Sequence, residues 1–152
     1  MPSLSRLIAP LTILILLGLT ACSPIGPIPA GQLSGDVQPI PSDWSASDDI
    51  QIVQIETRPD NPYSINIWGV GEGRNFYIGA GGGEDVAWVR HLADDAQIRL
   101  RLGSSLFLLT AVRVTDVAEQ TRVGKLYAAK YDEFDAEAST PGEAVMFRLD
   151  PR

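Results

Sequence analysis

Cysteine and histidine are nearly absent from this chain, since Cys22 and His91 are the only residues of their types among 152. An intrachain disulfide cannot form, and a metal site built from several histidines is excluded, so we expect no metal centre. Basic residues are also few: 12 stand against 19 acidic ones, which gives a net charge of −7. Such an acidic chain will not bind nucleic acid through general electrostatics.

Long hydrophobic runs are missing as well. The apolar run near the start extends only from Leu7 to Leu19. As a helix it would measure about 20 Å, well short of the ~30 Å hydrocarbon core of a bilayer. Together with the positive charge at Arg6, this length favours a cleaved export signal over a membrane span.

The residues that end this run, Leu19-Thr20-Ala21-Cys22, resemble the lipobox of bacterial lipoproteins. The resemblance implies a signal peptide over residues 1–21, cleavage just before Cys22, and lipid on Cys22 as a membrane anchor. An ordinary signal peptide with a chance cysteine is the alternative. Ser23 stands where lipoproteins of the inner membrane usually carry Asp. The expected location is therefore the cell envelope, on the outer membrane facing the periplasm if the source is Gram-negative.

Proline and glycine are concentrated after the signal. Residues 22–49 contain Pro24, Pro27, Pro29, Pro39 and Pro41, together with Gly26, Gly31 and Gly35. A segment of this composition buries too little apolar surface to offset its ordering entropy, so we predict a tether there. Residues 50–152 are then left as one small domain.

Alternating apolar residues predict strands over residues 50–57, 63–70, 76–78, 98–102, 106–114 and 144–149. Helices are predicted over residues 84–94 and from Asp116 to about Tyr131, the second because Asp116 and Glu119 have the spacing of a capping box. For the hairpin around residues 103–105 we favour a three-residue loop, which pairs Leu100 with Leu108 on an apolar face; a two-residue loop would mix arginines into that face.

This order of elements has antiparallel hairpins and only two short helices. It predicts a mainly β (α+β) fold, a closed or nearly closed antiparallel barrel, rather than a doubly wound sheet.

Several short motifs resemble the split β-barrel flavin-binding proteins, and most of all the branch with the deazaflavin-dependent nitroreductases. They are Phe76-Tyr77-Ile78-Gly79, the glycine-rich turn after it, Trp88-Val89-Arg90-His91-Leu92, Ile98-Arg99-Leu100-Arg101 and Tyr127-Ala128-Ala129-Lys130-Tyr131. The resemblance implies an antiparallel split β-barrel and a flavin-type cofactor, FMN or a deazaflavin. It implies cofactor contacts at Gly79, Ala80, Gly81, Trp88, Arg90 and His91. It also suggests a homodimer, since split barrels commonly build their site between two subunits.

Each of these features also has a structural interpretation. The glycine run can cradle a phosphate, but Glu84 and Asp85 follow it and would repel one, which favours a plain turn. Arg99, Arg101 and Arg113 could hold a phosphate or simply pair with carboxylates. His91, Trp68 and Trp88 are more typical of packed side chains than of catalytic or stacking residues. The acidic run at Asp132, Glu133, Asp135 and Glu137 is typical of a solvated loop.

Two functional hypotheses remain open. One is a membrane-anchored oxidoreductase that uses FMN or a deazaflavin, in which the cofactor carries the hydride chemistry. The other is a non-catalytic envelope lipoprotein without a cofactor, whose barrel is a scaffold for a protein partner or an apolar ligand. The presence of Gly79-Ala80 where the resemblance leads us to expect a Ser or Thr hydroxyl favours the second slightly.

Overall fold

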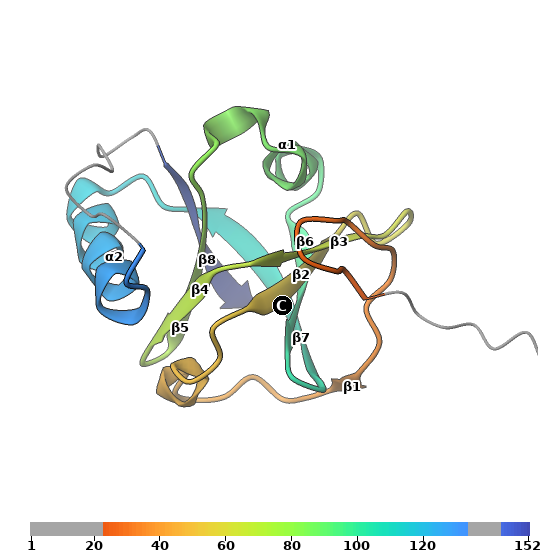
Figure 1. The fold of residues 1–152 in the computed structure, drawn as a ribbon, viewed down its shortest axis with the longest axis horizontal. Coiled ribbons are helices and arrows are strands. Elements are labelled where there is room, and N and C mark those ends of the chain that lie inside the picture. The colour runs from red at the N-terminus through yellow and green to blue at the C-terminus, as the bar shows by residue number, and fades with distance from the viewer. Residues whose placement is uncertain (1–22, 134–143) are drawn as a thin grey trace, which may run out of the picture.

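Eight strands and two α-helices make up residues 23–133 and 144–152, the parts of the chain that the computed structural model describes (Figure 1). The strands are β1 (Asp36–Val37), β2 (Val53–Thr57), β3 (Tyr63–Ile67), β4 (Gly69–Glu72), β5 (Asn75–Ala80), β6 (Gln97–Leu102), β7 (Ser105–Arg113) and β8 (Val145–Pro151). The helices are α1 (Ala87–Asp94) and α2 (Val117–Lys130), and two 3₁₀ turns are η1 (Ser45–Ser47) and η2 (Gly83–Asp85). The mainly β fold with two helices is confirmed. The signal peptide, Cys22, Asp135 and Glu137 lie outside the described residues.

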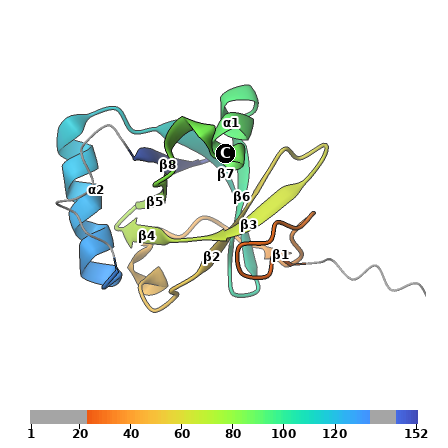
Figure 2. The same cartoon turned by 45° about the horizontal axis from the view of Figure 1, so that its top comes forward.

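Seven strands form a continuous path in the order β3-β2-β6-β7-β8-β5-β4, and each neighbouring pair is antiparallel. The two ends of the path, β3 and β4, are separated in sequence only by Trp68. One bent stretch of chain therefore pairs with β2 through its first part and with β5 through its second, and so the sheet curls into a barrel (Figure 2). The predicted antiparallel barrel is confirmed, with the expected strand over residues 63–70 divided at Trp68.

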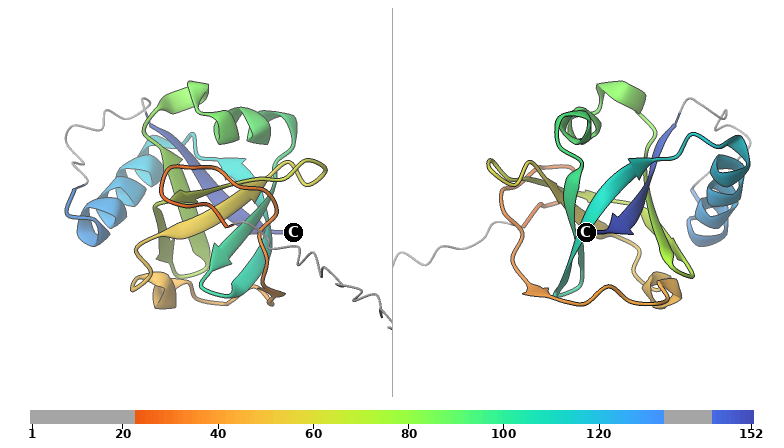
Figure 3. Two further views of the ribbon diagram at one scale, coloured as in Figure 1. Left: turned by 45° about the vertical axis from the view of Figure 1, so that its right-hand side comes forward. Right: turned by 180° about the vertical axis from the view of Figure 1, so that it is seen from behind.

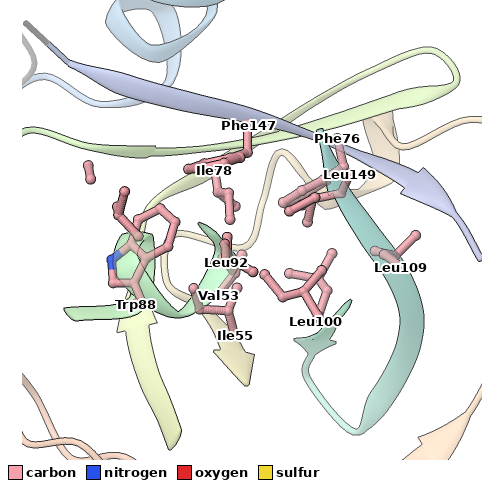
Figure 4. Close-up of a cluster of buried hydrophobic side chains, with 14 of the residues drawn as sticks. Val53, Ile55, Phe76, Ile78, Trp88, Leu92, Leu100, Leu109, Phe147 and Leu149 are labelled. Carbon is pink, nitrogen blue, oxygen red and sulfur yellow. The ribbon is translucent and has the colours of Figure 1, made fainter. Parts of the chain in front are cut away.

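Aromatic side chains cover the two ends of the barrel. At the η1 end, the Trp44 ring centroid lies 5.2 Å from that of Phe76 and 5.0 Å from that of Phe107. At the opposite end, α1 inserts Trp88 against Phe147, with centroids 5.8 Å apart (Figures 1 and 4). Aliphatic residues from the inward faces of the strands fill the space between them, among them Val53, Ile55, Ile78, Leu100, Leu109 and Leu149. These residues form the main core of the barrel, to which β2, β5, β6, β7 and β8 contribute.

The register predicted for the central hairpin is wrong. Strands β6 and β7 are joined by a two-residue turn, so that Leu100 faces Phe107 and Arg99 faces Leu108. Gly103 adopts a φ of 59° at the first turn position, a conformation that suits the twist of a two-residue hairpin. This register places Arg99 and Arg101 on the outer face of the hairpin, together with Leu106, which is fully buried. The two arginines are tolerated there because the Glu56 carboxylate and the Ser34 carbonyl oxygen accept their hydrogen bonds.

Part of the segment predicted as a tether is built into the barrel. Strand β1 pairs in parallel with the start of β7, at Val37 and Leu106. Leu33 and Trp44 from the same segment are as buried as any core residue. The segment crosses the outside of the sheet over β3, where Ala30 and Ser64 exchange backbone hydrogen bonds of 2.9 and 2.8 Å (Figure 3).

Helix α2 packs on the outside of the barrel, over β4, β5 and β8 (Figure 3). Its predicted cap is present, because the Asp116 carboxylate accepts a hydrogen bond of 2.7 Å from the Glu119 amide. Val123 and Tyr127 on its inner face pack against Val70 and Tyr77, which forms a second, smaller apolar cluster. Among the described residues, no helix is long and apolar enough to span a membrane.

Candidate functional site

A groove on the outer wall of the barrel runs past Trp68 and Gly79, and we call it the wall groove. Its narrower part, about 160 Å³, lies beside α2; its wider part, about 460 Å³, lies beside the N-terminal segment. Both parts share Trp68 and Gly79 in their lining. The narrower part adds Ala80, Gly81, Tyr127, Ala144 and Met146, and the wider part adds Gly26, Pro27, Ile52, Asn66 and Ile67.

Trp68 occupies the point where the barrel wall divides. The preceding residue, Ile67, still pairs with Val53 of β2, whereas the following residue, Gly69, already pairs with Ile78 of β5. The indole is half-buried and stacks on Tyr131, the residue that follows α2, with ring centroids 4.6 Å apart and an angle of 11° between the planes. A flat apolar wall is thus fixed beside the groove by the change of strand partner and by stacking.

Gly79 leaves the groove without a side chain at its centre, although the protein does not require glycine there. A β-carbon at Gly79 would meet its nearest neighbour, the Tyr127 hydroxyl, at 3.7 Å, and one at Gly81 would meet nothing within 4 Å. Gly69 is different, since a β-carbon there would lie 2.7 Å from the Phe76 ring. The two glycines of the groove therefore keep space open on the outer surface rather than relieve a clash inside the barrel.

Two tyrosines, one in the last turn of α2 and one just after it, hold the backbone next to the groove. The Tyr127 hydroxyl donates to the Trp68 carbonyl oxygen at 3.2 Å. The Tyr131 hydroxyl accepts from the Gly69 amide at 3.0 Å and lies 2.9 Å from the Gly69 carbonyl oxygen. Burial raises the pKa of both tyrosines above the ordinary value, so both stay neutral at physiological pH. Their role is to fix the position of Trp68.

Lys130 is the nearest cation on α2, and its amine is already used. It donates to the carbonyl oxygens of Ser47 and Gly69 at 3.1 and 2.9 Å. Burial lowers the pKa of this lysine, while Asp48 and Asp49 act in the opposite direction. We therefore assign Lys130 to joining α2, η1 and β4.

The structure brings together three of the six residues predicted for cofactor contact. Gly79, Ala80 and Gly81 lie side by side in the wall groove. Trp88 is buried inside the barrel against Phe147, and Arg90 is on the exposed face of α1. Neither residue lines the groove.

His91, the sixth residue, packs against the ends of β2 and β3. Its Nδ1 lies 3.0 Å from the Thr57 hydroxyl, and its ring meets Tyr63 edge-on at 5.0 Å. Burial lowers the pKa of His91, and the positive charges of Arg58 and Arg90 lower it further. These contacts describe a neutral, packed histidine.

The three arginines considered for phosphate binding have partners within the described residues. Arg99 forms an ion pair with Glu56 at 3.0 Å, and Arg113 pairs with Glu84 at 2.5 Å. Arg101 donates to the Ser34 carbonyl oxygen and to the Ser23 hydroxyl.

Sequence reasoning missed most of the groove. Asn66 and Trp68 alternate with Ile65 and Ile67 and so share one face of the predicted strand, but the sequence favours a packed side chain at Trp68 over a stacking surface. Tyr127 lies on the inner face of α2, against the outer wall of the barrel, and it also lines the groove. No local pattern could place Gly26 and Pro27 opposite Gly79, because their meeting depends on how the N-terminal segment crosses the sheet.

The charge of the groove limits what it can hold. Among the described residues, none that lines either part of the wall groove is a lysine, arginine or histidine. The described part of the chain also lacks any group of three His, Cys, Asp or Glu side chains placed to hold a metal ion. The lining is mainly apolar and aromatic, which suits a flat, uncharged group.

Comparison with known proteins gives similarity at the level of structure. A candidate pyridoxamine 5′-phosphate oxidase from Listeria innocua superposes with a TM-score of 0.55 at 12% identity, over 69% of this chain and 86% of that one. A conserved hypothetical protein from Mycobacterium tuberculosis gives a TM-score of 0.58 at 15% identity, over 69% and 75%. The chain has the split β-barrel fold.

A candidate 5-nitroimidazole antibiotic resistance protein from Bacteroides thetaiotaomicron has the same split barrel. Its TM-score is 0.51 at 10% identity, over 65% of this chain and 71% of that one. No protein-family model matches the sequence, and no curated protein does. The resemblance to split β-barrel proteins that the sequence motifs indicated is thus confirmed for the fold.

The wall groove fits one part of a flavin-type cofactor. Trp68 and the bare glycine floor suit a planar ring, which is the redox-active part of FMN and of deazaflavins. The phosphate of such a cofactor would need a charge-assisted partner. None lines the groove in the described residues. The described lining of the wall groove therefore fits the planar ring of such a cofactor and offers no partner for its phosphate.

Proposed function

We propose that the chain is a lipid-anchored envelope protein whose split barrel binds a flavin-type ring in the wall groove, as part of an oxidoreductase. The observation that carries the proposal is the open floor at Gly79 beside the indole of Trp68. The split β-barrel fold supports it, and the lipobox-like residues before Ser23 support the anchor.

In this proposal the protein binds and orients the ring. Trp68 offers a face for stacking, held by Tyr131 and by the hydrogen bond from Tyr127. The backbone at Gly79 and Gly81 allows close approach because no β-carbon intervenes. A flavin or deazaflavin, when bound, supplies the hydride chemistry, so that no protein nucleophile is needed.

A second candidate function is supported by the absence of cations from the described groove lining. A non-catalytic lipoprotein that holds an apolar, uncharged ligand would use the same walls without needing a phosphate site. The two candidates differ in whether a flavin binds at all.

A homodimer stays a prediction, which sedimentation of the purified protein measures.

The first prediction concerns ring binding. FMN and riboflavin are expected to bind the mature protein with affinities within about threefold, because the ring is the same and the described residues that line the groove include no basic side chain to bind the phosphate. If a basic side chain did bind the phosphate, FMN would instead bind more tightly than riboflavin by roughly 10- to 150-fold, the equivalent of about 1.5–3 kcal/mol. Titration followed by flavin fluorescence measures both affinities, and a deazaflavin is titrated alongside.

Gly79→Leu is expected to weaken this binding at least about tenfold, or roughly 1.4 kcal/mol, since the side chain would occupy the groove floor. Gly124→Leu is the matched control, because Gly124 lies on α2 in open space outside the groove lining. If none of the three compounds binds at high micromolar concentration, the flavin proposal is rejected and the apolar-ligand candidate remains.

The second prediction concerns the anchor. Cys22→Ser is expected to abolish retention of the protein in the membrane, because the acyl chains attach to that sulfur. Detergent phase partitioning of wild type and variant measures retention. Equal partitioning of the two would rule out lipidation at Cys22.

A further inference from the structure

The first described residues form a small apolar hairpin, residues 24–30, which we call the apolar hairpin. Ile25 and Ile28 exchange backbone hydrogen bonds of 3.3 and 3.0 Å across a turn at Gly26 and Pro27. Both isoleucine side chains point to solvent, with 76% and 63% of their surface exposed. The turn thus holds two exposed isoleucines next to each other on the surface.

The apolar hairpin is fastened to the barrel immediately after Cys22. The Ser23 hydroxyl accepts a hydrogen bond of 2.9 Å from Arg101. The Asn66 amide donates to the carbonyl oxygens of Pro24 and Gly26 at 3.2 and 3.1 Å. The segment is held again further along, where Arg99 donates to the Leu33 carbonyl oxygen at 3.1 Å. One peptide link, about 3.8 Å between α-carbons, therefore separates Cys22 from a residue attached to the barrel.

Charge is missing from the segment that contains the apolar hairpin. Residues 23–35 contain no Asp, Glu, Lys or Arg, although 20% of the whole chain is charged. Ile52, which is exposed as well, lines the wall groove together with Gly26 and Pro27 of the apolar hairpin. The apolar hairpin thus adjoins the wider part of the groove, whose described lining residues are uncharged as well.

We propose that the apolar hairpin docks on the lipid bilayer and that this brings the wider part of the wall groove, which Gly26 and Pro27 help to line, next to the lipid surface. This inference rests on the proposed anchor at Cys22. With an anchor one residue away and no flexible spacer between them, the barrel is held against the bilayer rather than suspended above it. Ile25 and Ile28 then enter the interfacial region, where apolar side chains gain by leaving water.

The bilayer is the occupant that these observations favour over a soluble protein. Two isoleucines offer too small an apolar area to capture a protein partner from solution. The bilayer does not need a large apolar area, because an anchor at Cys22 raises the effective concentration of lipid at the apolar hairpin. The lack of acidic groups over residues 23–35 also spares the surface the repulsion that an anionic bilayer exerts on the rest of this acidic chain.

Hydrogen exchange of the protein prepared without its natural lipid tests the proposal. The chain from Cys22 onward is coupled through its thiol to a maleimide lipid in vesicles of phosphatidylethanolamine and phosphatidylglycerol, and is compared with the uncoupled chain. The backbone amides of Ile25, Gly26, Ile28 and Ala30 are expected to exchange at least about threefold more slowly on the vesicles, while those of α2 stay unchanged. The double substitution Ile25→Ser and Ile28→Ser is expected to remove the difference, and Val117→Ser on exposed α2 is the control.

Three other outcomes would overturn the proposal. The first is unchanged exchange of residues 24–30 on coupling, and the second is protection that survives the double substitution. The third is protection without vesicles that grows with protein concentration, which would assign the apolar hairpin to a second copy. Because the maleimide lipid replaces the natural one, this test does not depend on whether cells acylate Cys22. Failure of the Cys22→Ser prediction would reject the natural anchor, whereas the exchange result would still show whether the apolar hairpin contacts lipid.

Discussion

Trp44→Ala is expected to lower the free energy of unfolding by about 3–5 kcal/mol, the usual cost of deleting a large buried aromatic side chain. Trp44 is buried between Phe76 and Phe107 at one end of the barrel. Its amide also donates to the Gly73 carbonyl oxygen at 2.7 Å. A β-carbon at Gly71 would lie 2.5 Å from the Trp44 carbonyl oxygen, so the neighbouring strand is shaped to receive this residue.

Chemical denaturation of the mature protein measures this loss. Ile25→Ala is the matched control, because it lies in the same proline-rich segment but is exposed, and it should change stability by no more than about 0.5 kcal/mol. A loss below about 1 kcal/mol for Trp44→Ala would mean that residues 22–49 behave as the tether that their composition predicts.

The parts of the fold that local signals control were predictable. Asp116 with Glu119 marked the start of α2, and the structure contains that cap. Alternation of apolar residues located β6 and β7 to within a residue of their ends. The antiparallel barrel followed from the number of hairpins relative to helices. Each of these signals acts within a few residues, where the sequence itself determines the geometry.

The parts that depend on distant contacts were not predictable. The register of the β6–β7 hairpin was wrong because Arg99 and Arg101 looked unsuitable beside Leu106 and Leu108. Their partners, Glu56 and residues 23–34, come from elsewhere in the chain. Distant contacts also explain why residues 22–49 are not simply a tether. Composition describes a segment by itself, whereas Leu33 and Trp44 are ordered because they pack against the barrel.

The candidate site was predictable only where it lies on one strand. Gly79, Ala80 and Gly81 follow one another in sequence, and they share the groove. Trp88, Arg90 and His91 were added because they follow in the same motif, but α1 covers the end of the barrel and turns away from the wall. The opposite side of the groove comes from Gly26, Ile52 and Trp68, which only the closed sheet brings together.

Arg99→Met should be as damaging as the loss of Trp44, with an expected cost of about 3–5 kcal/mol, because it leaves a buried carboxylate without its counter-charge. The Glu56 side chain is 2% exposed and accepts hydrogen bonds of 3.0 and 3.2 Å from Arg99. It also accepts one of 2.5 Å from the Leu33 amide, so the ion pair fastens the N-terminal segment as well.

Arg113→Met is the matched control, since Arg113 and its partner Glu84 are 43% and 66% exposed and their ion pair should contribute no more than about 1 kcal/mol. Denaturation of both variants gives the comparison. Adding Glu56→Leu to Arg99→Met should restore much of the lost stability, because the penalty comes from the unpaired charge rather than from the missing attraction. Equal losses for Arg99→Met and Arg113→Met would show instead that water reaches Glu56, and the ion pair would then no longer account for how residues 23–38 are held to the barrel.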